Sequence, residues 1–164
     1  MSFDPNAFLE STEVQGAMET KFVRIPPGDY QAMISNVEGR EAVFTPKKGP
    51  RAGQEVRQPC VDITYSIDVG VGDGTKVKEA TGMDTPSITQ GIFLDVNAAG
   101  QLEMGPGKNI NLGRLRAACG LNDPSKSFKF GMLKGQIVKI KVDQVPNPND
   151  PNDPYSNVTG VTAV

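Results

Sequence analysis

Strict alternation of apolar and polar residues marks two segments of the chain as strands. In residues 135–145, Val138, Ile140 and Val142 fall on one side, and charged residues occupy the positions between them. In residues 60–69 every odd-numbered position is apolar. Because successive side chains of a strand point to opposite faces, both segments predict strands with one buried face.

Residues 29–44 predict a long, bent strand. Tyr30, Ala32 and Ile34 share one face, but the alternation changes phase at Ser35–Asn36. A phase change inside a strand is what a β-bulge produces. Strands that bend in this way are common where a sheet closes into a barrel.

Residues 112–120 predict a short helix. Leu112, Leu115 and Cys119 follow at the three- and four-residue steps that place side chains on one helical face. Gly120 then provides a stop, because glycine readily adopts the left-handed conformation that ends a helix.

Three further segments complete the expected elements. Residues 76–83 predict a strand in which Val77 is the one strong apolar residue, and residues 87–104 predict a hairpin. Residues 158–164 predict a last strand, after the proline- and asparagine-rich segment 146–154.

The order of these elements indicates a mostly β protein, a five-stranded OB-like barrel with one short helix between strands 3 and 4. In an OB fold the loops between strands 1 and 2 and between strands 4 and 5 frame the binding face. Here they correspond to residues 45–57 and 146–155. We therefore expect one OB-like β-barrel domain at 28–164, preceded by an N-terminal arm at 1–27. A β-sandwich with one helix fits the same periodicity and stays the alternative.

The arm at 1–27 is polar, with four acids and two bases. Ser2 to Pro5 predicts a cap for a short helical turn, and Phe3 and Phe8 are too sparse for a core helix. We expect the arm to dock on its own domain or on a neighbouring subunit, which makes it a candidate for homo-oligomer contacts. A disordered arm is the alternative, because termini are often loose unless tied down.

The absence of histidine excludes several kinds of catalysis. Among 164 residues of net charge −2 there is no histidine, which removes Ser-His-Asp and Cys-His catalysis and the usual zinc sites. A carboxylate-bound metal nuclease needs clustered acids, whereas Asp62, Asp68 and Asp84 are scattered along the chain. We therefore expect no enzymatic activity, no cofactor and no metal site.

The two cysteines and the hydropathy indicate an ordinary intracellular protein. Cys60 and Cys119 lie far apart in different predicted elements and are interpreted as buried thiols, with a disulfide or a reactive thiol as the alternative. No apolar run approaches the length of a membrane span, and no basic-then-apolar leader opens the chain. We expect a cytoplasmic location and no membrane partner.

Basic residues gather in two blocks of this weakly acidic chain. From Lys108 to Lys141 there are eight Lys or Arg residues against one acid, and the loop at 45–57 carries four bases against one acid. Proteins that bind single strands need cations along the phosphates and aromatic faces on which bases stack. The expected nucleic-acid-binding residues are bases of both blocks and aromatic residues at loop edges: Lys47, Lys48, Arg51, Arg57, Phe44, Lys126, Phe128, Lys129, Phe130, Lys134, Lys139, Lys141 and Tyr155.

The strongest stacking candidates are Phe128 and Phe130, which flank Lys129 in a predicted loop. The alternative is that both rings fold back onto the helix as part of the core. The basic loop at 45–57 has a similar alternative, since most basic loops are only solvated surface.

Three segments resemble single-stranded-DNA-binding proteins of tailed-phage replication clusters. They are Ile25–Tyr30 (IPPGDY), Leu112–Gly120 (LGRLRAACG) and Leu133–Val142 (LKGQIVKIKV). The resemblance implies a role in phage DNA replication or recombination in the host cytoplasm, with single-stranded DNA and other replication or recombination proteins as partners. Many such phage proteins end in an acidic tail that recruits these partners, whereas this sequence ends in VTGVTAV.

The sequence therefore predicts a single-stranded-DNA-binding protein that is largely independent of base sequence. The alternative is a phage virion structural or assembly protein, of decoration or connector type, that binds no nucleic acid. In that case the basic blocks would meet acidic surfaces of partner proteins. Salt separates the two, because DNA binding weakens steeply as counterions are released.

Overall fold

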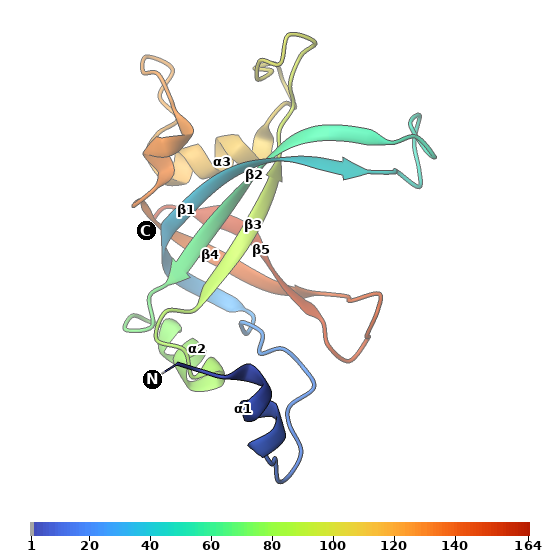
Figure 1. The fold of residues 1–164 in the computed structure, drawn as a ribbon. Coiled ribbons are helices and arrows are strands. Elements are labelled where there is room, and N and C mark those ends of the chain that lie inside the picture. Colours follow the sequence, from blue (N-terminus) through green and yellow to red (C-terminus); the bar gives the residue numbers. More distant parts are fainter. Residues whose placement is uncertain (1) are drawn as a thin grey trace.

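The computed structural model describes residues 2–164. It contains five strands, three α-helices and one 3-10 helix (Figure 1). In chain order these are α1 (Pro5–Ser11), β1 (Gly28–Phe44), β2 (Val56–Ile67), α2 (Gly74–Thr81), β3 (Ser87–Phe93), α3 (Ile110–Ala118), η1 (Phe130–Leu133), β4 (Ile137–Val145) and β5 (Tyr155–Thr162).

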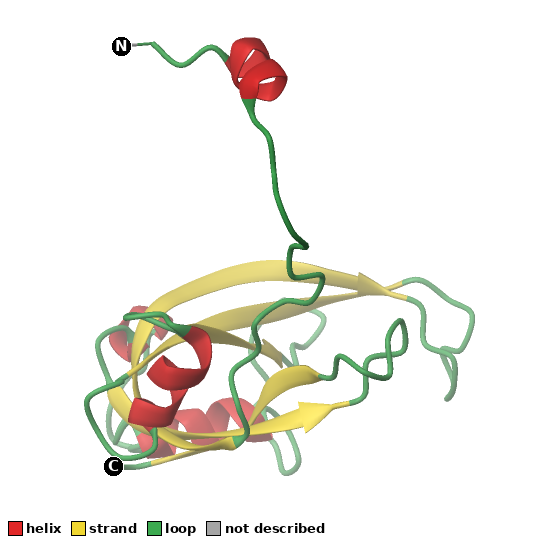
Figure 2. Ribbon diagram, turned by 90° about the horizontal axis from the view of Figure 1, so that it is seen from below, coloured by secondary structure: helices red, strands yellow, loops and turns green. Residues whose placement is uncertain are grey.

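The five strands form one antiparallel sheet in the order β3-β2-β1-β4-β5. The central strand, β1, pairs with β4 through its first half and with β2 through its second half. The sheet curves until its two edge strands, β3 and β5, come into contact, but within residues 2–164 no ladder of hydrogen bonds joins them (Figure 2). The predicted mostly β class is therefore confirmed, with the helix between strands 3 and 4, and the sheet is not closed into a barrel.

The phase change predicted in β1 is present as a register shift. The pairing of β1 with β2 slips between Ile34 and Asn36, and the skipped Ser35 donates its hydroxyl to the Thr64 carbonyl at 3.2 Å. Beyond this point β1 and β2 continue as a long hairpin that extends past the rest of the sheet (Figure 1).

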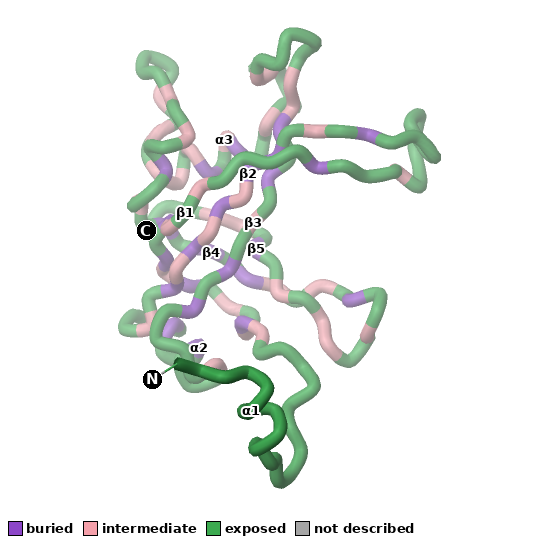
Figure 3. The backbone as a smooth tube through the Cα atoms, in the orientation of Figure 1, coloured by how far each residue is buried: buried purple, intermediate pink, exposed green. Residues whose placement is uncertain are grey.

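The core lies on the concave side of the sheet, where the alternating residues of β1, β2 and β4 meet α3 (Figure 3). Val138, Ile140 and Val142 are fully buried, as the alternation predicts. Tyr65 is also fully buried and donates its hydroxyl to Gln90 Oε1 at 2.7 Å. Its burial raises the pKa of the phenol. Tyr65 therefore lies on the buried face that the alternation in residues 60–69 predicts.

The helix α3 is confirmed close to its predicted position. Leu112 and Leu115 are its buried residues, and Gly120 adopts the left-handed conformation (φ 70°) just beyond its end. Both cysteines are free thiols, Cys60 buried and Cys119 half-buried.

The strand predicted at 76–83 is wrong, because residues 76–81 belong to α2. One apolar residue, Val77, suffices to anchor a two-turn helix, and its exposed neighbours do not alternate between two faces. The helix begins at Gly74, whose hydrogen points at the end of β2. A Cβ there would lie 1.9 Å from the Asp68 carbonyl oxygen, so only glycine fits.

The hairpin predicted at 87–104 is correct only in its first half. Residues 87–93 form β3, whereas the second half pairs through a single bridge, Val96 with Leu102. The Asn97 carboxamide oxygen accepts hydrogen bonds from the backbone amides of Ala99 and Gln101, both at 3.0 Å. This closes a tight loop in place of a strand. The strands β2 and β5 also begin earlier than predicted, at Val56 and Tyr155.

The N-terminal arm stands clear of the body (Figure 2). All described side chains before Arg24 are exposed, and α1 at its tip has no buried residue. None of the helices in residues 2–164 is long and apolar enough to cross a membrane.

Candidate nucleic-acid interface

One face of the β1–β2–β3 hairpin region carries a row of exposed polar and aromatic side chains. Residues directly opposite one another on neighbouring strands share a face, so the register of Cys60 with Arg40 and with Phe93 places these three together. We call this surface the Phe44–Phe93 face, and its residues are Glu38, Arg40, Ala42, Phe44, Val56, Gln58, Cys60, Asp62, Thr64, Thr89, Gly91 and Phe93. It lies on the side of the sheet opposite the core.

Two phenylalanine rings stand together on this face. The centroids of Phe44 and Phe93 are 5.7 Å apart at an interplanar angle of 63°, and the side chains are 37% and 51% exposed. The strands beneath them carry the small buried residues Ala42 and Cys60, whose burial raises the pKa of the Cys60 thiol. The two rings therefore cover the buried residues Ala42 and Cys60, and part of each ring stays exposed to a ligand.

An arginine lies beside the two rings on the same face. Arg40 Nε donates to Asp62 Oδ2 at 2.7 Å, which fixes the guanidinium and raises its pKa. Gly91 leaves the surface next to Arg40 flat, since a Cβ at Gly91 would lie 3.3 Å from Arg40 Nη2. A planar cation and two aromatic rings on a flat surface are groups on which nucleobases stack.

The loop between β1 and β2 carries the first predicted basic block. Lys47, Lys48 and Arg51 are exposed and form no ion pair within residues 2–164. This loop continues directly from Phe44 at the end of β1, so Lys47 and Lys48 follow the Phe44–Phe93 face within four residues. Arg51 lines a hollow with Arg57 and Leu94. Arg57 differs, because it pairs with Glu41 at 3.0 Å and with Glu55 at 3.1 Å.

Phe128 and Phe130 lie elsewhere, next to α3. Both rings are half-buried against the core, and they pack edge to face with centroids 5.5 Å apart. The Arg116 guanidinium lies 4.5 Å from the Phe128 centroid. Part of each ring is thus already covered within the chain, as the alternative interpretation expects. Lys126 and Lys129 on the same segment are exposed.

The remaining lysines of the second block are near the far end of β1. Lys139 and Lys141 of β4 pair in register with Gln31 and Asp29 of β1, and Lys134 precedes β4. Gln31 and Phe44 are thirteen positions apart on one strand, roughly 43 Å of chain at 3.3 Å per residue. Lys139 and Lys141 therefore lie far along β1 from Lys47 and Lys48, whereas Lys108 of the second block lines one hollow with Arg51 and Arg57.

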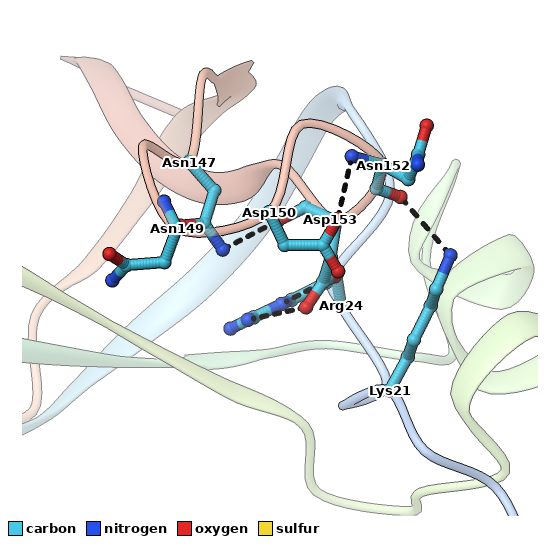
Figure 4. A network of polar contacts seen from close by, with 7 residues as sticks. All are labelled: Lys21, Arg24, Asn147, Asn149, Asp150, Asn152 and Asp153. Carbon is cyan, nitrogen blue, oxygen red and sulfur yellow. Dashed lines mark hydrogen bonds and ion pairs between the residues drawn. The ribbon is translucent and has the colours of Figure 1, made fainter.

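Tyr155, at the start of β5, contacts the root of the N-terminal arm. Arg24 lies over its ring, 5.2 Å from the centroid, and also pairs with Asp153 at 3.1 Å. Lys21 donates to the Asn152 carbonyl at 3.4 Å, and Ser156 donates to the Ile25 carbonyl at 2.6 Å. The arm is thus fastened to the loop between β4 and β5 at its root (Figure 4).

The loop between β4 and β5 has its own internal structure. Asn147 is buried and donates to the Asp153 carbonyl at 3.0 Å, and its carboxamide oxygen accepts from the Asn149 amide. The loops between β1 and β2 and between β4 and β5 project on the same side of the molecule (Figures 1 and 2).

We expect Asp153→Asn to loosen the root of the arm. The substitution removes the ion pair with Arg24, so trypsin should cut after Lys21 and Arg24 about threefold faster, the scale expected for one surface ion pair. The measurement is the rate of appearance of the fragment beginning at Phe22 or Ile25 at neutral pH. Asp84→Asn, which removes a carboxylate that pairs with Lys78 and not with the arm, is the control and should leave the rate unchanged.

The same pair sets the pH dependence of this contact. The hydrogen bond from Arg24 lowers the pKa of Asp153, so the contact is fully present above the ordinary aspartate pKa and is lost as pH falls through the lowered one. An NMR titration of the Asp153 carboxyl should give a midpoint below about 3.9, the ordinary value. The midpoint should rise toward that value in Arg24→Gln.

The sequence did not reveal Phe93 or Arg40 as residues of this face. Phe93 lies in the apolar run Ile92–Leu94, where alternation cannot tell which side faces out. Arg40 follows the phase change in β1, which moves every later side chain to the other face. Counting alternation from the far end, back from Phe44, would have placed Phe44, Ala42 and Arg40 together.

The acids considered for a metal site do not meet. Asp62 pairs with Arg40 and Asp84 with Lys78. Among residues 2–164 no group of three or more Cys, Asp or Glu side chains is placed to hold a metal ion. In comparisons with known proteins, no protein-family model and no curated protein sequence matches this chain.

Proposed function

We propose that this protein is an OB-like barrel that binds single-stranded DNA largely independently of sequence, in phage DNA replication or recombination. The strand order β3-β2-β1-β4-β5 and the helix between β3 and β4 support the fold, because an OB barrel is partly open and is reached by bringing the edge strands of such a sheet together. OB folds bind oligonucleotides on the face of strands 2 and 3 and with the loops between strands 1 and 2 and strands 4 and 5.

The observation that carries the proposal is the pair of exposed rings on that face. Phe93 is the most exposed aromatic residue outside the arm in residues 2–164, and it adjoins Phe44 on strands where burial would be expected of phenylalanine. Two bases of a single strand stack on Phe44 and Phe93, and Arg40 contributes a planar cation beside them.

The phosphates follow the basic loop. Lys47, Lys48 and Arg51 have no carboxylate partner in residues 2–164, so a phosphate does not have to displace one. The contribution of these cations depends on counterion release, and affinity falls by about 0.7 logarithmic units per phosphate contact and per tenfold rise in salt. Base-edge contacts are not needed, which makes the binding tolerant of sequence.

The test is fluorescence anisotropy of a labelled dT oligonucleotide titrated with the pure protein at low and at high salt. We expect saturable binding that weakens as salt rises and that an unlabelled duplex of equal length does not compete away. Absence of binding at low salt contradicts the proposal, and equal competition by duplex contradicts its preference for single strands.

An assembly role without DNA binding is the second candidate. The exposed arm favours it, because Phe3, Phe8 and Leu9 are 71%, 50% and 72% exposed and contact nothing on the body. An assembly protein would self-associate in the titration above without changing the anisotropy of the oligonucleotide.

A further inference from the structure

The tip of the arm is a formed helix that packs against nothing in its own chain. Asp4 caps α1 by accepting hydrogen bonds from the Asn6 and Ala7 amides at 3.0 and 3.3 Å, and Pro5 occupies the first turn. Phe3 and Phe8 pack across the cap with centroids 5.4 Å apart, in the arrangement of a hydrophobic staple. A helix of seven residues is marginal in water without tertiary contacts. The cap and the staple therefore stabilise a helix whose apolar side chains have no surface to pack on in their own chain.

The outer part of the arm carries only negative charge. Residues 2–20 contain four acids, Asp4, Glu10, Glu13 and Glu19, and no base. None of the four forms an ion pair within residues 2–164. The partner of the arm must therefore combine an apolar hollow with a surplus of positive charge.

The surface around α3 has both properties. Residues 110–134 carry five bases, Arg114, Arg116, Lys126, Lys129 and Lys134, against one acid, and none of the five forms an ion pair within the described part of the chain. A hollow of about 150 Å³ opens beside one of them, Arg116. We call it the α3 cleft, and its apolar lining is Leu102, Met104, Leu112 and Phe128.

The α3 cleft suits an aromatic side chain. An apolar cavity of about this volume in another protein binds benzene, so the ring of Phe8 or Phe3 matches it in size. Met104 at its rim is 82% exposed, and Lys108 and Arg116 also line it. The only carboxylate in the lining, Glu103, is paired with Lys108 at 3.2 Å.

The arm of one chain points away from its own cleft. In Figure 1 α1 is among the nearest parts of the molecule and α3 is among the more distant, and Figure 2 shows the arm standing clear of the sheet. We propose that the arm of one copy docks its α1 side chains into the α3 cleft of a second copy. Because two different surfaces meet, the contact is heterologous, and repetition gives a ring or an open chain of subunits.

Two variants test this contact in the absence of DNA. The arm variant carries Phe8→Ser and Leu9→Ser and leaves the α3 cleft unchanged. The cleft variant carries Arg114→Glu, Lys126→Glu and Lys129→Glu and leaves the arm unchanged. Light scattering after gel filtration should show the wild type growing beyond its 17.5 kDa chain mass as concentration rises. Each variant alone should remain at 17.5 kDa. All the changed side chains are exposed, so both variants should fold.

Mixing the two variants is the sharper measurement. The intact arm of the cleft variant can enter the intact cleft of the arm variant, but no second contact remains, so the mixture should stop at twice the chain mass. A wild type that stays at 17.5 kDa at every concentration, an arm variant that still associates, or a mixture that stays monomeric would each overturn the proposal. None of these results bears on binding of single-stranded DNA.

Discussion

Replacing both Phe44 and Phe93 by alanine should weaken binding of a dT oligonucleotide at least thirtyfold. Stacking of one base on an aromatic side chain is worth about 1–3 kcal/mol by alanine substitution, and the two rings lie side by side on the same face. Each single substitution should account for about 5- to 150-fold. The measurement is the dissociation constant by fluorescence anisotropy at low salt.

Leucine provides the matched control for this prediction. Phe44→Leu with Phe93→Leu keeps an apolar cover over Ala42 and Cys60 but removes both π-faces, so thermal unfolding should stay near that of the wild type while binding is lost. Phe93→Tyr should retain binding. If Phe128→Leu abolishes binding while Phe93→Leu does not, the interface lies beside α3 and the Phe44–Phe93 face is not the site.

Changing Lys47, Lys48 and Arg51 together to glutamate should cost about 100-fold or more in affinity at low salt. Each lost phosphate contact corresponds to about 1 kcal/mol at the surface, and the new carboxylates add repulsion. Removing three contacts should also lower the slope of log affinity against log salt by about 2. The fold should not change, because these side chains are exposed and unpaired in the described chain.

The control reverses the charge of two lysines of β4, which pair with the other end of β1. Lys139→Glu with Lys141→Glu changes the net charge in the same direction but lies far from Phe44 along the strand. Its affinity for DNA should fall much less. The loop variant changes the net charge by −6 and the control by −4, so equal losses of free energy per unit of charge would show that the effect comes from net charge and that the loop between β1 and β2 does not form the site.

The alternation of apolar and polar residues, together with the turn residues, predicted the elements in which one face is buried and the other is exposed. In β4 the alternating residues Val138, Ile140 and Val142 are fully buried, so the period of two is clear over this part of the strand. The bulge in β1 was visible for the same reason, as a change of phase. Gly120 marked the end of α3 because its left-handed backbone requires a residue of that kind.

The sequence could not predict elements whose form depends on tertiary contacts. Residues 76–83 offer one apolar anchor, and that is compatible with a strand or a helix until the close approach of Gly74 to β2 decides it. The sequence also did not indicate that Lys139 and Lys141 pair with the end of β1 opposite to the loop that carries Lys47 and Lys48. Charge clusters along a chain carry no information on which face of a sheet they occupy.

The aromatic residues of the candidate site show the same limit. Phe128 and Phe130 flank a lysine in the sequence, yet both pack against the core beside Arg116. Phe93 gives no signal in the sequence and becomes visible only when its register with Cys60 places it beside Phe44.

The most direct test of the proposed interface uses Phe93→Trp. The chain contains no tryptophan, so the introduced indole is the sole one and reports on its own surroundings. If bases stack at this position, a dT oligonucleotide should quench its fluorescence saturably, with the dissociation constant found by anisotropy, and salt should reverse the quenching. Met104→Trp, on the exposed loop before α3, should show no quenching. An oligonucleotide that binds by anisotropy and leaves the indole at position 93 unquenched would contradict the account.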